Sequence, residues 1–173
     1  SFKKQEYTVA LSITDGSAAP DSPSVKHGDP YTLTLTPDVG FELKAENIQG
    51  IPADSDCDNI QPTYQSDNNT YRYHIESLTE ACEINAVFTI IQYDVTTRVI
   101  GDGGTLSLIT DTPVNYDEKA IVKATPDANY LIESVSSSCG AMLPVAGEPN
   151  QFATENGLKE PCTITATFKK QEY

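Results

Sequence analysis

The chain has 173 residues, which is enough for one medium domain or two small ones. Its 25 acidic residues outnumber its 11 basic ones, and the net charge of −14 argues against a nucleic-acid partner and against an anionic membrane surface. No apolar run approaches the length of a membrane span, so we expect no membrane insertion of this segment.

Alternation of apolar and polar residues predicts half-buried strands through the first half of the chain. The expected strands cover residues 7–13, 31–35, 71–75 and 82–88. Asp15 and Gly16 mark a turn after the first strand. Thr36-Pro37-Asp38 ends the second strand, because proline fixes its own φ and restricts the residue before it. Residues 46–50 have room for one helical turn.

The second half repeats this order. Strands are expected at residues 93–99, 121–122 and 162–168, with a glycine-rich turn at 101–104. Thr125-Pro126-Asp127 repeats the proline turn, and residues 133–138 again have room for one helical turn. The chain is therefore expected to be mostly β.

The two ends of the chain carry the same six residues. Phe-Lys-Lys-Gln-Glu-Tyr occupies residues 2–7 and again residues 168–173, and a weaker copy occupies residues 88–93. This repetition predicts a tandem array whose duplicated unit is a pair of domains. We predict two repeat domains, residues 4–90 and 91–170, and residues 171–173 are expected to begin the next repeat.

The junction at residues 88–93 contains neither glycine nor proline. We therefore expect the last strand of one domain to run directly into the first strand of the next, as a short and stiff connection. Phe2, Phe88 and Phe168 are expected to seat the junctions.

Four cysteines occur, two in each repeat at matching places. Three pairings are possible, and only Cys57–Cys82 with Cys139–Cys162 makes each repeat a self-contained unit. Closing a loop of this size contributes roughly 3 kcal/mol of stability by the chain-entropy estimate. We predict these two disulfides, and with them an oxidising compartment outside the cell.

A longer pattern joins these elements. It is clearest in Ala-Thr-Pro-Asp-Ala-Asn-Tyr at residues 124–130 and Cys-Thr-Ile-Thr-Ala-Thr-Phe at residues 162–168, with first-repeat versions at 35–41 and 82–88. The pattern resembles the divergent internalin B-repeat family of large bacterial surface and secreted proteins. One departure is that Gly28 in the first repeat is replaced by Asp117 in the second.

The resemblance implies small β-rich domains with a β-grasp-like fold that act as stalk or adhesive modules. It brings no family-wide catalytic residues. Strand order is not written in an alternation pattern, so an immunoglobulin-like β-sandwich remains the alternative fold.

Catalytic chemistry finds little support in the residues. Both histidines, His27 and His74, lie in the first repeat, which also argues against a zinc site because the second repeat lacks any counterpart. Asp38 and Asp127 do recur, but each follows Thr-Pro, where aspartate is a turn residue. We predict that the protein is not an enzyme, with no catalytic residues and no cofactor.

Calcium is the metal worth testing against the sequence. Asp54, Asp56 and Asp58 are spaced like the start of a calcium loop, but Asn59 and Gln65 stand where such a loop needs glycine and glutamate. The second repeat has no equivalent run. A solvated polar loop without metal is the expected structure, and a calcium-stiffened segment is kept as an alternative.

Tyrosines supply the only candidate ligand contacts. Tyr64 and Tyr71 lie in the longer insert of the first repeat, and Tyr64 is the one expected to be exposed, while Tyr71 and Tyr73 alternate on a strand and fit a core. The variable mid-repeat loops, residues 52–70 and 136–157, are where a host or environmental glycan or protein would be contacted.

These observations together predict a structural stalk or spacer segment of a large exported bacterial surface protein. Its partners are expected to be neighbouring repeats of the same chain. A carbohydrate- or protein-binding adhesive module is the second hypothesis, and the calcium-stiffened adhesin segment is the third.

Overall fold

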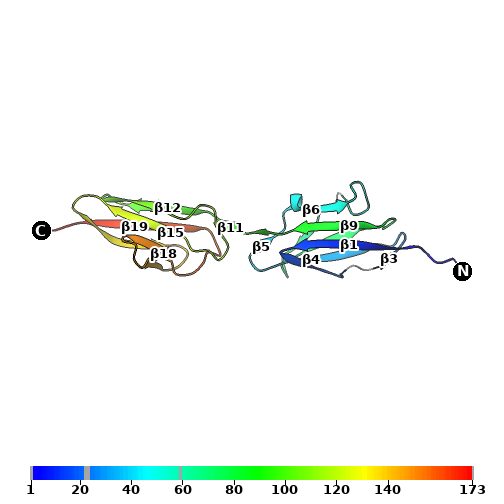
Figure 1. Cartoon of the computed structure of the whole chain (residues 1–173). Coiled ribbons are helices and arrows are strands. Elements are labelled where there is room, and N and C mark those ends of the chain that lie inside the picture. The colour runs from blue at the N-terminus through cyan, green and yellow to red at the C-terminus, as the bar shows by residue number, and fades with distance from the viewer. Residues whose placement is uncertain (1, 22–23, 59, 173) are drawn as a thin grey trace. The chain divides into compact units, whose positions relative to one another are not determined.

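The computed structural model describes residues 2–21, 24–58 and 60–172. Within these residues the regular structure is almost entirely β, with one 3-10 helix, η1 (Ala45–Asn47). The chain forms two compact units, Ser1–Ile90 and Ile91–Tyr173 (Figure 1). The prediction of a mostly β protein is confirmed.

Unit 1 contains a mixed sheet with its first and last long strands at the centre. In order, the strands are β3 (Ser24–Lys26), β1 (Glu6–Thr14), β9 (Cys82–Val87) and β6 (Ile48–Ile51). The central pair is parallel, with Val9 opposite Cys82 and Thr14 opposite Val87. The two outer pairings are antiparallel.

A second sheet in unit 1 is antiparallel throughout. Its strands, in order, are β2 (Gly16–Ala19), β4 (Tyr31–Pro37), β8 (Thr70–Ile75) and β7 (Thr63–Gln65). A short pair of strands, β5 (Phe41–Glu42) and β10 (Thr89–Ile90), is added where the chain leaves the unit.

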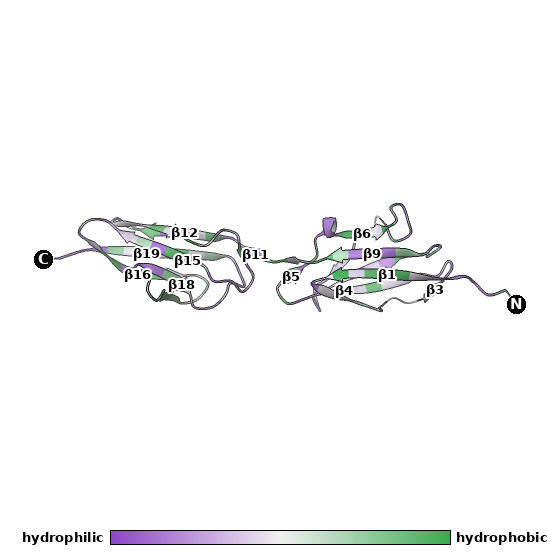
Figure 2. Cartoon of the chain, in the orientation of Figure 1, coloured by the Kyte–Doolittle hydropathy of each residue, from purple (hydrophilic) through white to green (hydrophobic). Residues whose placement is uncertain are grey.

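The two sheets of unit 1 share one core. Val9 and Ile84 from the mixed sheet and Leu33 and Tyr73 from the antiparallel sheet all belong to the same buried cluster. Because side chains alternate along a strand, each sheet turns one face inward and leaves the other polar. Figure 2 shows this as hydrophobic and hydrophilic residues interleaved along the strands.

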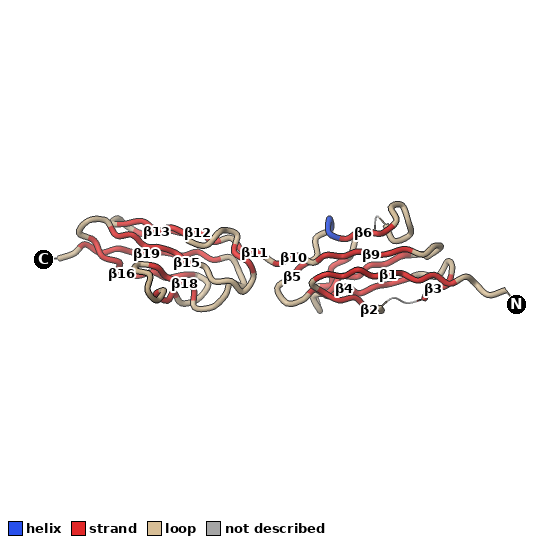
Figure 3. The backbone as a smooth tube through the Cα atoms, in the orientation of Figure 1, coloured by secondary structure: helices blue, strands red, loops and turns tan. Residues whose placement is uncertain are grey.

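Unit 2 repeats the arrangement. Its mixed sheet has the order β12 (Val95–Ile100), β19 (Cys162–Lys170) and β16 (Tyr130–Ser137), and β11 (Gln92–Tyr93) pairs with β14 (Val114–Asn115). Its antiparallel sheet has the order β13 (Gly104–Leu108), β15 (Ile121–Pro126), β18 (Gln151–Thr154) and β17 (Met142–Pro144). Figure 3 labels β13, β15 and β18 of this sheet. The pair β12 and β19 is parallel, with Val95 opposite Cys162, the same register as in unit 1.

A glycine in each unit allows the chain to change sheets after the first strand. A Cβ atom on Gly104 would come within 2.6 Å of the Phe168 ring and of the Thr125 carbonyl oxygen. Gly16 is crowded in the same way by the Phe88 ring and the Thr36 carbonyl. Only glycine fits such a close approach.

Phe88 and Phe168 therefore have a role that differs from the predicted one. Their side chains are only 1% and 8% exposed, and each packs into the core of its own unit. They fill cores next to the switch glycines, because alternation along the last strand turns them inward. Phe2 is fully exposed.

The predicted proline turns are present, but the predicted helical turns are not both found. The Thr-Pro-Asp turns are confirmed, since the Phe41 and Tyr130 amides donate to the carbonyls of Asp38 and Asp127. The helical turn expected at residues 46–50 is met only in part: η1 covers Ala45–Asn47, and residues 48–50 belong to β6, which pairs with β9. The one expected at 133–138 is wrong: these residues continue β16, where pairing with β19 and a register shift between Ile132 and Ser134 hold the chain extended.

Candidate functional site

Both predicted disulfides are present. Cys57–Cys82 and Cys139–Cys162 have Cα atoms 5.9 and 5.3 Å apart, within the usual range for a disulfide. In each unit the second cysteine is the first residue of the last strand, and the first lies in the mid-repeat segment. Each disulfide therefore joins the start of that strand to a segment outside the parallel ladder.

A buried tyrosine supports the disulfide in unit 1. The Tyr73 hydroxyl donates to the Cys57 carbonyl, and its side chain is 1% exposed. Burial, and to a smaller extent the neighbouring Asp58 carboxylate, raises the pKa of Tyr73 to about 12. The hydroxyl stays protonated at physiological pH and remains a hydrogen-bond donor.

The acidic run considered for calcium is used to shape its own loop. One oxygen of Asp56 accepts hydrogen bonds from Thr79, including its hydroxyl at 2.8 Å. The Asp58 carboxylate accepts the Asp54 amide at 2.9 Å. Asn59 lies outside the described residues. Over the described ranges, no three His, Cys, Asp or Glu side chains gather where they could hold a metal.

The two candidate contact tyrosines lie together, but they differ in role. Tyr64, on the edge strand β7, is 52% exposed, and its ring centroid is 5.1 Å from that of Tyr71. Tyr71 accepts a hydrogen bond from the Leu43 amide at 3.3 Å and packs near the Phe88 ring, so it belongs to the core edge. Only Tyr64 presents a ring to solvent, held by a 3.0 Å hydrogen bond to Asn69.

The mid-repeat segments are less loop-like than predicted. Residues 52–70 include β7, and residues 136–157 include β17 and β18. The prediction of a loop over 136–157 is wrong in that part, because these strands complete the antiparallel sheet of unit 2. Leu143, on the corresponding edge strand β17, is exposed too, but its ladder partner is Ala153, beside Ile121, whereas that of Tyr64 is Tyr71, beside Leu35, so the two are not at equivalent positions.

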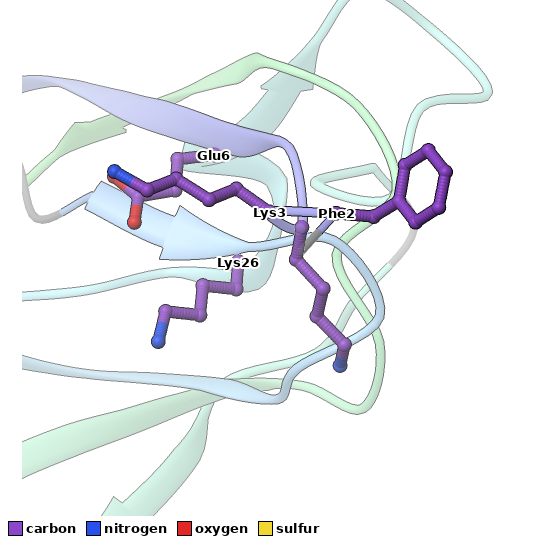
Figure 4. A pocket seen from close by; sticks show the side chains of 5 residues that line it. Phe2, Lys3, Glu6 and Lys26 are labelled. Atoms are coloured by element: carbon purple, nitrogen blue, oxygen red, sulfur yellow. The ribbon is translucent and has the colours of Figure 1, made fainter.

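Two shallow hollows are lined by the repeated six-residue string. One is formed by Phe2, Lys3, Lys4, Glu6 and Lys26 (Figure 4), and the other by Leu131, Lys169, Lys170, Gln171 and Glu172. In the first hollow the Lys4 ammonium lies 3.0 Å from the Asp29 carboxylate, and both side chains are substantially exposed. Neither hollow encloses a group of residues suited to catalysis.

The two copies of the string are paired in complementary halves. In the copy at residues 2–7, Glu6 and Tyr7 pair with Lys26 and Val25, at the start of β1. In the copy at residues 168–173, Phe168, Lys169 and Lys170 pair with residues 130–132, at the end of β19. The string thus contains both a strand end and a strand start.

The weaker copy at residues 88–93 contains both a strand that pairs in unit 1 and a strand that pairs in unit 2. Thr89 and Ile90 pair with β5 in unit 1. The Ile91 carbonyl accepts the Tyr116 amide, and Gln92 and Tyr93 pair with β14 in unit 2. Every residue of this connection from Thr89 to Tyr93 therefore has a backbone partner in one unit or the other.

Some features had no usable sequence signal. The hydrogen bonds from Thr79 to the Asp56 carboxylate join residues far apart in the chain, and so does the contact of each switch glycine with its phenylalanine. The sequence repeats the glycine, as Gly16 and Gly104, and the phenylalanine, as Phe88 and Phe168. Nothing in the sequence indicates that the two are in contact.

The fold and its disulfides define a class of small, cysteine-stapled β domains that occur in series. Residues 93–172 match the family model described as a divergent InlB B-repeat domain, which agrees with the resemblance seen in the sequence. The match favours a repeat module of a bacterial surface protein. Comparisons with curated proteins and with solved structures found no match. Among the described residues, no helix is long and apolar enough to cross a membrane.

Proposed function

We propose that the chain is a spacer segment of a large exported bacterial surface protein, in which serial repeats hold a functional tip away from the cell. The observation that carries this proposal is the parallel pairing of the first and last strands in each unit. A chain that enters along one strand and leaves along a parallel neighbour must exit at the opposite end of the unit.

The distance gained follows from strand geometry. Each parallel ladder contains the same six-residue span, Val9 to Thr14 in unit 1 and Val95 to Ile100 in unit 2. At about 3.3 Å per residue, each ladder carries the chain forward about 20 Å. Antiparallel first and last strands would bring the chain back to its starting end and add no length.

The connection between the units also supports a spacer. Each of residues 89–93 has a backbone partner in unit 1 or in unit 2, which supports the short connection proposed from the lack of glycine and proline. A flexible linker would let successive units fold back on one another and would shorten the array.

For the fold of each domain we favour a two-layer arrangement built on a β-grasp-like centre. A β-grasp sheet has its first and last strands parallel in the middle, as in the order β3-β1-β9-β6. Here a second sheet covers the core where a β-grasp domain places its helix. Immunoglobulin-type sandwiches are built from two antiparallel sheets, which the mixed sheet does not match.

The remaining predictions form part of the same proposal. The segment acts without catalysis or cofactor, outside the cell, with neighbouring repeats as its partners. The two disulfides and the family of residues 93–172 are consistent with an exported, oxidising location. The charge of −14 would keep arrays of such units soluble and mutually repelling.

A second candidate function rests on Tyr64. Its half-exposed ring on an edge strand is suited to stacking on a sugar or contacting a protein. This adhesive role would depend on the ring, so it should be lost in Tyr64→Ala while the melting temperature is kept.

Small-angle X-ray scattering of the oxidised chain tests the spacer proposal. We expect a maximum dimension well above that of a compact protein of the same mass, and the same value with and without millimolar calcium. A compact particle would overturn the proposal. A dimension or melting temperature that rises with calcium would instead favour the calcium-stiffened segment.

A further inference from the structure

The parallel ladder has the same construction in both units. Six residue pairs join β1 to β9 and six join β12 to β19, and in each case the register begins with a valine opposite a disulfide cysteine. The last strand is also paired on its other side, β9 with β6 and β19 with β16. Each ladder is therefore embedded in a sheet.

The direction of the strands decides how a pull on the chain would act. Tension enters unit 1 at Glu6, the start of β1, and leaves at Val87, the end of β9. Because the strands are parallel, these two points lie at opposite ends of the ladder, and tension slides one strand along the other. All the backbone hydrogen bonds of the ladder then bear the load together, whereas pulling both strands from one end would break them one at a time.

We infer that the β1–β9 and β12–β19 ladders are load-bearing clamps, and that the disulfides limit how far a unit extends after its clamp yields. This further function rests on the proposed spacer role, since only a segment held at both ends carries tension.

The disulfides set the path that tension follows. Cys82 is the first residue of β9, so a pull along β9 passes through its sulfur to Cys57 and bypasses residues 58–81. Cys162 at the start of β19 does the same through Cys139 in unit 2. The bypassed chain contains β7 and β8 in unit 1 and β17 and β18 in unit 2. These strands would not be pulled directly even after the clamp has broken.

The core side of the ladder adds resistance to sliding. Val9 and Ile84 in unit 1, and Ile164 and Ala166 in unit 2, are fully buried against the opposite sheet. Moving a strand by one residue would turn its buried side chains toward solvent, because side chains alternate between faces. Sliding must therefore disrupt hydrogen bonds and core packing at the same time.

Single-molecule stretching of the full chain, held by handles at its two ends, tests both parts of the inference. With intact disulfides we expect two unfolding events. Their gains in length should be nearly equal, and each should be shortened by the residues that the disulfide bypasses. With a reductant, each event should lengthen by about 80 Å, since separations of 25 and 23 residues extend at about 3.5 Å per residue. An unchanged length would overturn the proposed load path.

A second pulling direction tests the clamp itself. A handle on Asp102, in the exposed turn just after β12, and one at the end of the chain pull β12 and β19 from the same end. We expect unit 2 to lose most of its resistance in this direction. Equal forces in the two directions would overturn the clamp. The scattering experiment decides the spacer role without any force, so the clamp can fail while the spacer proposal stands.

Discussion

Unit 1 and unit 2 share the strand order around the parallel pair but break different strands: the first strand is continuous in unit 1 as β1 and divided into β11 and β12 in unit 2. The strand beside the last one is continuous in unit 2, as β16 with a single irregularity near Ile132. In unit 1 the corresponding chain is broken into β5, the helix η1 and β6. What stays constant is the parallel ladder, the switch glycine with its phenylalanine, and the disulfide. These three features are common to both domains, and the strand beside the ladder varies in continuity.

The largest expected loss of stability comes from removing the core phenylalanine that each unit has at the same position. Phe88→Ala should destabilise unit 1 by about 3–5 kcal/mol, because it empties a buried site beside Gly16. Phe168→Ala should do the same to unit 2, measured by denaturant unfolding. Phe2→Ala, in the same hexapeptide as Phe168 but fully exposed, is the matched control and should leave stability unchanged. Equal costs for all three would contradict the assigned core positions.

Removing each disulfide separately sharpens the comparison. Replacing Cys57 and Cys82 by alanine should cost unit 1 roughly 3 kcal/mol, and replacing Cys139 and Cys162 should cost unit 2 a similar amount, since the closed loops are nearly equal in length. Thermal unfolding of the two variants should show one destabilised transition each. A single variant that lowers both transitions would show that the units unfold as one.

The switch glycines predict a smaller, matched effect. Gly16→Ala and Gly104→Ala should each destabilise by about 1–3 kcal/mol, because the new methyl group meets a phenylalanine ring and a backbone carbonyl. Ser17→Ala, at the next and exposed position, is the control. Chemical denaturation measures the difference. A glycine substitution without cost in one unit would mean that the two corners are built differently.

Alkaline pH should lower the stability of unit 1 more than that of unit 2. Burial raises the pKa of Tyr31 and Tyr73 in unit 1 from 10.0 to about 12, so the folded unit holds these protons more tightly than the unfolded chain. The stability they contribute is complete below pH 10 and is lost as the pH rises toward 12. Unit 1 should therefore weaken over this window, and Tyr73→Phe should reduce the slope. If neither Tyr73→Phe nor Tyr31→Phe changed the loss of unit 1 stability between pH 10 and 12, these two tyrosines would not be its cause.

The smallest effect is expected for the exposed ion pair. Asp29→Asn should change the stability of unit 1 by less than about 1 kcal/mol, because Lys4 and Asp29 are both open to solvent and salt. Comparing unfolding at low and high ionic strength measures it. A larger loss would mean that the segment before β1 is held more firmly than its exposure indicates.

Local structure could be predicted from the sequence because its signals are local. Alternation located the strands from Tyr7 and from Cys82, the proline turns ended where Thr-Pro-Asp predicted, and repeat symmetry paired the cysteines. The exposure of Tyr64 also followed from its place in a polar insert. Whether that ring binds anything stays a prediction.

Sheet order could not be obtained in the same way. Alternation shows that β1 has a buried face but does not show that its neighbour is β9, some seventy positions away along the chain. The inward turn of Phe88 was misjudged for a related reason: its partner, Gly16, is distant in sequence, while the junction beside it is near. Residues 133–138 were misjudged because pairing with β19 overrides weak local preference.

The complementary halves of the repeated hexapeptide have a consequence for how such genes change length. Phe168 closes the core of one unit, and four residues later in the same string lies the residue type that opens β1 in unit 1, Glu6. Recombination between two copies of this string would add or remove a whole pair of units and leave every strand in register. The seam of the exchange would lie between the end of one strand and the start of the next, so a longer or shorter protein would need no new strand pairing.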